Sequence, residues 1–251
     1  MWATTGSYLL TRTALTDAQS RVDGELQSQM RNAGVGFSDL VIRRIELVRL
    51  MSHTQGVPEA LKANDFNTLR SRLGPLLLNS RADALLILDA ADEEKFALWR
   101  NASELEVGAV GLPNEDRRKI GSVARSTVSD KSVLLSRSTK GPLVLTTSVV
   151  RFKGAYVGSL AVGNLSSSLV ARLGESAVIV DKAGKSQEPA VALYDAQGNF
   201  IDSNKPVVML TKDAVVHPRS SHESVGDRPV LVGELVANGA VVARLAIFHE
   251  G

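Results

Sequence analysis

One pattern of apolar and acidic residues occurs twice along the chain. In the first copy, the apolar run Ala84–Asp89 ends in an aspartate, a short turn follows, and a second run begins at Phe96. In the second copy, the run Val191–Asp195 ends in the same way, and the next run begins at Phe200. Short apolar runs between turn residues are typical of β-strands. The repeat predicts two small antiparallel sheets in tandem, with both aspartates as turn residues.

Each copy is followed by a long apolar hairpin. The first covers Leu143–Val162 and the second covers Pro229–Phe248. Lys153-Gly154 and Asn238-Gly239 are dipeptides that suit two-residue hairpin turns. Since such a turn fixes the pairing of the strands, the first hairpin should bring Ser148 opposite Ser159, and the second should bring Val230 opposite Ile247.

This register predicts that the first hairpin has two unlike faces, because side chains alternate between the faces of a sheet. One face carries bulky side chains that we expect to pack on a long helix: Leu145, Val149, Leu160 and Val162. The other face carries small side chains, several with hydroxyl groups: Thr146, Ser148, Ser159 and Ala161. Small residues leave space and hydroxyls orient a guest, so this face could be the floor of a ligand cavity. The alternative is that small residues let a covering helix approach closely.

Helical spacing dominates the first 80 residues. Apolar residues recur three or four apart across residues 5–51, and Gly34 and Gly36 are expected to break or bend this long helix. Two shorter helices are predicted over Val57–Leu61 and Asp65–Leu73, the second stopped or bent by Gly74-Pro75.

The remaining elements complete two modules. A helix over Glu115–Ser126 should form a lid on the first sheet, and a helix over Ser166–Leu173 should join the modules. The second module has only the polar stretch Lys205–Asp227 at the place of the lid, so its lid should be reduced. Its hairpin carries apolar side chains on both faces, which indicates a structural module. The predicted domains are a helical segment over residues 1–80, a first module over 81–174 and a smaller second module over 175–251.

Composition narrows the classes of function. The 251 residues carry a formal net charge of +2 with the basic residues scattered, which does not suggest a nucleic-acid surface. The absence of cysteine excludes disulfides and Cys-ligated zinc. No apolar run reaches the roughly 18 residues of a membrane span. The abrupt beginning and end are typical of a piece from between two membrane spans, with Trp2 and Tyr8 near one cut. The alternative is that Trp2 is merely a terminal residue.

Catalytic and cofactor motifs are missing from the sequence. It contains no phosphate loop, dinucleotide fingerprint, Gly-x-Ser-x-Gly or His-Glu-x-x-His. His217, His222, Glu223 and Asp227 could be considered as metal ligands, but their spacing fits neither a helix face nor strand alternation, and we interpret this stretch as a solvated loop. We therefore expect no enzyme activity, no cofactor and no metal site.

Three arginines could reach the predicted cavity. Arg100 follows the second strand, Arg125 lies on the lid helix and Arg137 lies on the strand before the hairpin. The planar guanidinium group suits a carboxylate. The alternative for each of them is a solvated surface position.

At this level the chain resembles the double Cache sensor domains of bacterial histidine kinases, chemoreceptors and cyclic-nucleotide enzymes. The resemblance lies in the order of elements along nearly the whole chain and in pieces such as Phe152–Gly163. It implies an α+β fold with long N-terminal helices packed on two tandem PAS-like antiparallel sheets. Trp99-Arg100 lacks the aromatic neighbours that mark the amino-acid-binding members, so amino-acid sensing is not supported.

The resemblance also implies a function and a location. We expect an extracytoplasmic ligand-sensing domain, periplasmic or extracellular, between flanking transmembrane helices of the parent protein. The first module would bind a small ligand such as a carboxylate, with six candidate residues: Arg100, Arg125, Arg137, Thr146, Ser148 and Ser159. Ligand closure of the lid would move the long helix. The alternative is a dimerisation or scaffold module with no ligand, which pairs through the helix stripe Val22–Phe37; an enzyme is the weaker rival.

Overall fold

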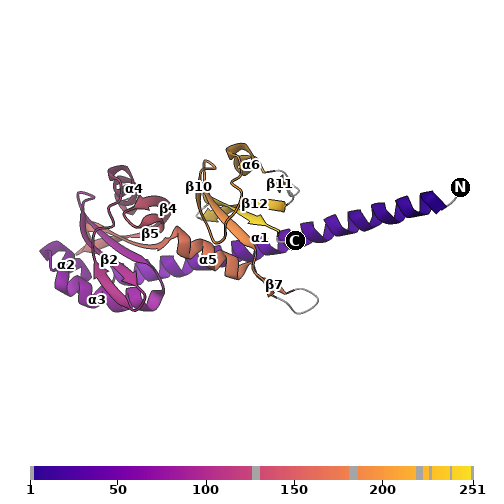
Figure 1. The fold of residues 1–251 in the computed structure, drawn as a ribbon. Helices are drawn as coiled ribbons and strands as arrows, with labels where there is room; N and C mark the ends of the chain where they lie inside the picture. Colours follow the sequence, from indigo (N-terminus) through magenta and orange to yellow (C-terminus); the bar gives the residue numbers. More distant parts are fainter. Residues whose placement is uncertain are drawn as a thin grey trace. The chain divides into compact units, whose positions relative to one another are not determined.

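A computed structural model describes residues 3–125, 131–180, 186–218, 223–225, 228–237 and 239–249 (Figure 1). The chain divides into two compact units. The six-stranded unit comprises Ser38–Leu169 and Val236–Val242, and the five-stranded unit comprises Met1–Phe37, Val170–Leu235 and Ala243–Gly251. The order of long helix, sheet, lid helix and second sheet agrees with the predicted fold class. The domain boundaries predicted from the sequence stay a prediction.

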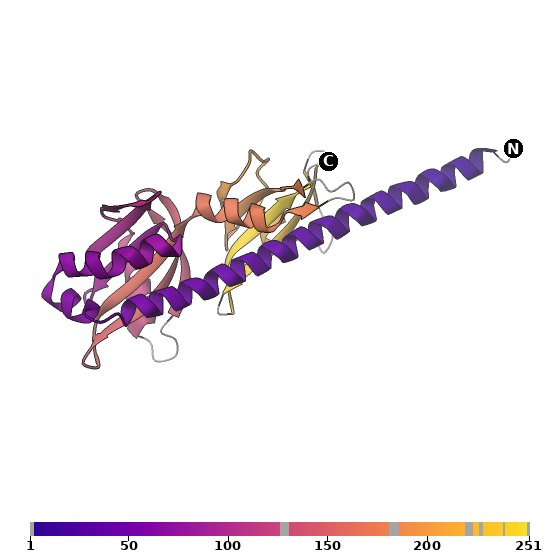
Figure 2. The same ribbon diagram turned by 90° about the horizontal axis from the view of Figure 1, so that it is seen from below.

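The first element in this order is a single helix of 50 residues. Helix α1 runs from Ala3 to Ser52 without interruption (Figure 2), so the expected break at Gly34 and Gly36 is wrong. Gly36 instead permits close packing within the five-stranded unit, because a Cβ atom there would lie 2.6 Å from Ser176 Oγ. A Cβ atom on Gly34 would meet nothing within 4 Å. The glycine that the sequence offered as a helix breaker is therefore a contact point.

The six-stranded sheet is antiparallel throughout, with the order β3-β2-β1-β6-β5-β4. Its strands are β1 (Ala84–Asp89), β2 (Glu94–Asn101), β3 (Glu104–Val107), β4 (Lys131–Ser138), β5 (Gly141–Phe152) and β6 (Ala155–Leu165). The short, mostly exposed edge strand β3 was not predicted.

Three helices cover one face of this sheet. They are the end of α1, α2 (Val57–Ala63) and α3 (Phe66–Ser80). Asp65 caps α3, and its carboxylate accepts hydrogen bonds from Thr68 N at 3.1 Å and Thr68 Oγ1 at 2.6 Å. The helix continues through Pro75, although the sequence predicted a stop or a bend at Gly74-Pro75. Tertiary packing of Leu73 and Leu77, which are fully buried on either side of the proline, offsets its poor helix propensity.

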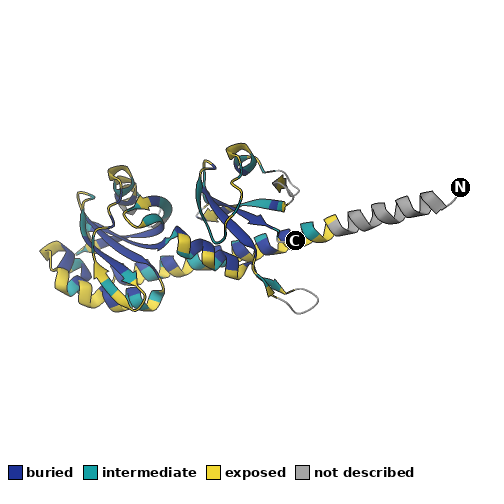
Figure 3. Ribbon diagram, in the orientation of Figure 1, coloured by how far each residue is buried: buried dark blue, intermediate teal, exposed yellow. Residues whose placement is uncertain are grey.

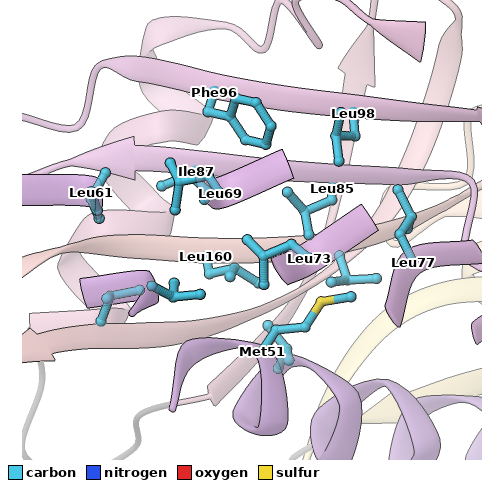
Figure 4. Packing of buried hydrophobic residues seen from close by; sticks show 14 of the residues in the cluster. Met51, Leu61, Leu69, Leu73, Leu77, Leu85, Ile87, Phe96, Leu98 and Leu160 are labelled. Atoms are coloured by element: carbon cyan, nitrogen blue, oxygen red, sulfur yellow. The ribbon is translucent and has the colours of Figure 1, made fainter. Parts of the chain in front are cut away.

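A cluster of buried apolar side chains fills most of the space between these helices and the sheet (Figure 4). Leu85 and Ile87 of β1 and Leu160 of β6 face side chains of α1 and α3, such as Met51 and Leu73. Strands β1, β5 and β6 are buried along most of their length (Figure 3). Removal of this apolar area from water is the main stabilising contribution.

Helix α4 (Asn114–Arg125) covers the opposite face of the sheet, as Figure 1 shows. We call this face the lid face. Ile120 of α4 packs in a second apolar cluster with Leu86, Trp99 and Leu143 from the sheet. The predicted lid helix is therefore confirmed, and most of the surface that it covers is filled with protein side chains.

The first hairpin has the predicted turn but a different register. Lys153 and Gly154 have φ angles of 49° and 82°, and Phe152 pairs with Ala155. A bulge between Val150 and Arg151 then shifts the pairing by one residue. A shift of one residue moves side chains to the other face.

The bulge exchanges the two faces of β5 while those of β6 stay as predicted. Leu160 and Val162 face the helices, whereas Ser159, opposite Leu88, and Ala161, opposite Leu86, lie on the lid face. On β5, Thr146 now pairs with Val162 and Ser148 with Leu160, so both hydroxyls lie on the helix face. Leu145 and Val149 lie on the lid face. The predicted grouping of Thr146, Ser148, Ser159 and Ala161 on one face is wrong.

The five-stranded unit repeats the plan in a smaller form. Helix α5 (Ser166–Ser176) leads to it, and its sheet has the order β10-β9-β13-β12-β11. The strands are β9 (Ala190–Asp195), β10 (Phe200–Ser203), β11 (Glu223–Val225), β12 (Arg228–Ala237) and β13 (Ala240–Phe248). A separate two-stranded ribbon joins β7 (Ile179–Val180) to β8 (Ser186–Gln187). The reduced lid is α6 (Lys212–Val216), as predicted.

The lid side of this second sheet is filled, as predicted. Tyr194 is fully buried, and its hydroxyl accepts a hydrogen bond from Leu210 N at 3.1 Å. Arg244 donates to the carbonyls of Val215 and Val216 at 3.1 Å each, which satisfies the end of α6. The second hairpin is also one residue out of its predicted register, because His249 N donates to Pro229 O at 2.9 Å. Its turn residue Asn238 lies outside the described residues.

Candidate functional site

The two aspartates of the repeated pattern organise turns, as predicted. Asp89 Oδ1 accepts hydrogen bonds from Ala91 N at 2.8 Å and Glu93 N at 3.0 Å. Asp195 Oδ1 accepts from Gln197 N at 2.9 Å and Asn199 N at 2.8 Å in the same way. Both carboxylates replace missing main-chain partners in a turn.

Within the first of these turns, Asp92 lies directly against the lid helix. Its backbone is left-handed, with a φ angle of 63°, and its side chain is only 10% exposed. A Cβ atom on Gly121 of α4 would lie 1.7 Å from Asp92 Oδ1, so only glycine admits the carboxylate at this position. The turn between β1 and β2 and the lid helix are thereby brought into contact.

Arg125, the last residue of α4, completes this contact. Its guanidinium group donates to both carboxylate oxygens of Asp92, Nη1 to Oδ1 at 2.9 Å and Nη2 to Oδ2 at 2.6 Å. It also donates to Ala90 O at 3.4 Å. The hydrogen bonds to Asp92 raise the pKa of Arg125 despite an opposing desolvation effect. Two parallel bonds to one carboxylate are the geometry in which arginine binds anions best.

Tyr156 and Ser159 extend this arrangement onto the sheet. The Arg125 guanidinium carbon lies 5.4 Å from the centre of the Tyr156 ring, a cation–π distance. The Tyr156 hydroxyl and Ser159 Oγ form a hydrogen bond of 2.8 Å. Burial raises the pKa of Tyr156, although the bond to Ser159 opposes this effect. We call Asp92, Arg125, Tyr156 and Ser159 the lid cluster.

Two of the six predicted site residues are therefore brought together, Arg125 and Ser159. Thr146 and Ser148 lie on the opposite face, where Ser148 Oγ is 3.2 Å from Ser52 Oγ of α1. Arg137 is exposed on β4 opposite Pro142, which agrees with the alternative of a solvated surface residue.

Arg100 belongs to a separate buried network at the other end of the sheet. It donates to Asp83 Oδ1 at 3.0 Å and to Ala82 O at 2.7 Å. Asp83 Oδ2 accepts from Asn164 Nδ2 at 3.1 Å and from Leu165 N at 3.0 Å. Asn164 Oδ1 in turn accepts from Arg44 Nε of α1 at 2.8 Å. This network joins α1 to the start of β1 and to the ends of β2 and β6.

No pattern in the sequence singled out Asp92 or Tyr156. Asp92 and Arg125 are separated by 33 residues, and no local pattern couples them. Tyr156 could have been noted, because it follows the predicted turn on the strand that carries Ser159. The large aromatic ring beside a candidate hydroxyl was the available signal.

Metal ligands and membrane spans were also considered from the sequence. No group of three or more His, Asp or Glu side chains in the described part of the chain could hold a metal ion. The candidate residues His222 and Asp227 lie outside the described residues, and His217 is exposed. Among the described helices, none is long and apolar enough to cross a membrane.

Solved structures resemble the chain along nearly its whole length. The extracellular domain of a protein described as the histidine kinase vpHK1S-Z8 gives a TM-score of 0.70 at 13% identity, over 93% of this chain and 92% of that one. A domain of a sensory box/GGDEF family protein from Vibrio parahaemolyticus gives 0.66 at 13% identity, over 91% and 95%. The sensory domain of the Campylobacter jejuni chemoreceptor Tlp3 with isoleucine bound gives 0.56 at 11% identity, over 96% of each chain.

These neighbours include an extracellular domain and a sensory domain. No protein-family model and no curated protein matches the sequence. At these identities the comparison rests on the arrangement of elements alone. The chain has the fold of the Cache-type extracellular sensor domains of histidine kinases, chemoreceptors and GGDEF proteins.

Proposed function

We propose that the chain is the ligand-sensing ectodomain of a bacterial membrane receptor, a histidine kinase, chemoreceptor or cyclic-nucleotide enzyme. In this proposal it lies outside the cytoplasm between transmembrane helices of the parent protein. A small carboxylate binds in the six-stranded unit at the lid cluster. The observation that carries the proposal is the bidentate pair of Arg125 with Asp92, a protein carboxylate in the position that a ligand carboxylate would take.

Binding is an exchange of one carboxylate for another. Arg125 is 41% exposed on its side chain, so a ligand can reach it, whereas Asp92 is held beneath the lid. When the ligand takes the guanidinium group, Asp92 and its turn lose their tie to α4. Tyr156 offers the ligand a ring face, and its hydroxyl is paired with Ser159. Arg100, Arg137, Thr146 and Ser148 are left out of this proposal because their contacts or positions lie elsewhere.

Strand β6 offers a path for the signal. It carries Tyr156 and Ser159 of the lid cluster near one end and Asn164, which binds Arg44 of α1, near the other. A ligand shifts only an equilibrium between states that it binds differently. A change in the packing of α4 on β6 would therefore alter how Asn164 holds α1, and movement of α1 is the output.

The test uses Trp99 as the reporter, since it is 2% exposed in the apolar cluster beneath α4. In a Trp2→Phe background, we expect at least one carboxylate of a panel to change Trp99 emission saturably and to raise the thermal midpoint, because binding to the folded state stabilises it. Arg125→Gln should abolish both responses, whereas Arg118→Gln, an exposed arginine on the same helix, should retain them.

Asp92→Asn should change the affinity for the carboxylate in the opposite direction. Because asparagine is neutral and competes less for Arg125, we expect the variant to bind the same carboxylate several-fold more tightly than the parent. The proposal fails if no acid in the panel acts on the parent. It also fails if Arg125→Gln responds like Arg118→Gln.

A second candidate function is dimerisation through α1. The predicted stripe Val22–Phe37 is not available for pairing with a second copy, because Leu26, Ala33 and Phe37 are buried within the chain itself. Within the six-stranded unit, α1 nevertheless carries two large apolar side chains that are exposed by half or more, Ile42 and Leu50. They are eight residues apart, so they lie on the same side of the helix.

Sedimentation equilibrium tests this second candidate. We expect the parent to dimerise and Ile42→Glu to weaken the dimer at least about tenfold, because a charge replaces apolar contact area. Val208→Glu, at an exposed valine outside α1, should leave association unchanged. A monomeric parent, or equal weakening by both variants, would remove the α1 dimer from consideration. A dimer that answers to no ligand would favour a scaffold over a sensor.

A further inference from the structure

A groove of about 440 Å³ lies at the free side of β2, away from the lid cluster. Its walls are the first turns of α3 and the segment where β3 ends. Ten residues line it, and they include Phe66, Arg70, Glu94, Phe96 and Val107. The volume falls within the range of natural small-molecule sites, which is about 300–1,000 Å³.

The sequence explains why the groove forms here. At Gly74, α3 comes so close to β3 that a Cβ atom would lie 2.8 Å from Leu105 Cδ1. Strand β3 pairs with β2 over only four residues and ends at Val107. The loop that follows is held by Glu94, whose carboxylate accepts hydrogen bonds from Val110 N at 2.6 Å and Gly111 N at 3.1 Å. The groove lies between the first residues of α3, strand β2 and the segment that follows β3.

Two apolar side chains at the groove are unusually exposed. Phe66 is 42% exposed and Val107 is 55% exposed. Phe66 lies parallel to Phe96, with ring centres 6.1 Å apart and planes inclined by 6°, so one phenyl ring is presented on a supporting ring. Exposed apolar surface that borders a groove is typical of binding sites.

Of the charged side chains that line the groove, one cation remains available to bind a ligand. Glu94 is occupied by two main-chain donors, and Lys95 is paired with Asp89 at 3.1 Å and Glu93 at 3.3 Å. Arg70, on the same helix as Phe66, forms no ion pair or hydrogen bond with any residue that the structure describes. A guanidinium group beside apolar walls matches a ligand with a carboxylate and an apolar body.

From these observations we infer that the groove is a second ligand site, which binds small organic carboxylates with an aromatic or aliphatic body. Arg70 binds the carboxylate in a bidentate manner, and the apolar body lies against Phe66 and Val107. The site is independent of the lid cluster, because none of its lining residues belongs to that cluster.

Phenylacetate and its neutral isostere phenylacetamide are suitable probes, measured by isothermal titration and by ligand-observed NMR saturation transfer. We expect phenylacetate to bind the parent at least about tenfold more tightly than phenylacetamide, the effect of a hydrogen bond to a charged group. Arg70→Gln should remove this preference, and Val107→Thr, which keeps the shape but adds a hydroxyl, should weaken both probes.

Two control variants test whether phenylacetate binds at the groove and not elsewhere on the chain. Arg72→Gln alters an exposed arginine of the same helix outside the groove and should behave like the parent. Arg125→Gln alters the lid cluster and should also leave phenylacetate binding intact. Unchanged thermal midpoints of Arg70→Gln would confirm that the variant is folded.

Three results would overturn the inference. They are no saturable binding of phenylacetate to the parent, equal affinity of the parent and Arg70→Gln, and loss of binding in Arg125→Gln alone. The last result would place the acid at the lid cluster and support the proposed function, so the two proposals fail separately.

Discussion

Asp83→Ala should lower the free energy of unfolding by about 3–5 kcal/mol, the effect of removing one member of a buried ion pair. Asp83 is 6% exposed, and its carboxylate binds Arg100, Asn164 and the main-chain N–H of Leu165. Its removal leaves a guanidinium group and two N–H donors without their acceptor in a region that water reaches poorly. Urea unfolding followed by circular dichroism measures the change.

Glu93→Ala is the matched control for this variant. Glu93 also pairs with a cation, Lys95, at 3.3 Å, but its side chain is 65% exposed. An exposed pair contributes at most about 1 kcal/mol. Combining Asp83→Ala with Asn164→Ala should be clearly less destabilising than the sum of the two, because the residues share one network. Additive losses, or a loss for Asp83→Ala no greater than for Glu93→Ala, would contradict the network.

Gly158→Ala should also be strongly destabilising, by about 3 kcal/mol, because overpacking forces backbone shifts. A Cβ atom at Gly158 would lie 2.2 Å from the main-chain oxygen of Leu88 and 2.9 Å from Leu61 Cδ2. The oxygen belongs to β1, which pairs with β6 here, so it cannot move away without breaking the sheet. Thermal and urea unfolding both measure the loss.

Gly108→Ala tests whether the effect arises from the site and not from the change of residue type. A Cβ atom there would lie 3.8 Å from Trp99 Cδ1, an ordinary contact distance, and the glycine belongs to the same unit. We expect its stability to stay within about 0.5 kcal/mol of the parent. Equal losses for the two variants would mean that Gly158 does not lie against Leu88.

The features that the sequence predicted well are those determined by neighbouring residues. Asp89 and Asp195 form turns because their carboxylates reach N–H groups two and four residues ahead. The lid helix and the Lys153-Gly154 turn are likewise encoded by short patterns. Strand β3 was missed although Glu104–Val107 alternates charged and apolar residues, the signal of a half-buried strand.

The features that it did not predict depend on contacts between distant segments. Gly36 was interpreted as a helix breaker, but it is needed for the approach of Ser176, 140 positions further along, as their numbers show. The bulge beside Arg151 cannot be deduced from the turn, and it reversed the faces of Thr146 and Ser148. The candidate site was predicted only in part, because it too depends on contacts between distant segments. Arg125 was recognised by its chemistry, whereas its partner Asp92 is known only from the folded chain.

The bulge in the first hairpin has a consequence for the construction of chimeric proteins that exchange this ribbon. Its turn alone does not carry the information about which side chains point toward α4. A graft that keeps Phe152–Ala155 but omits the irregularity at Val150 and Arg151 would turn Leu145 and Val149 away from the lid. The donor segment must therefore include both strands as far as their first regular pairs, or the recipient will acquire an inverted β5.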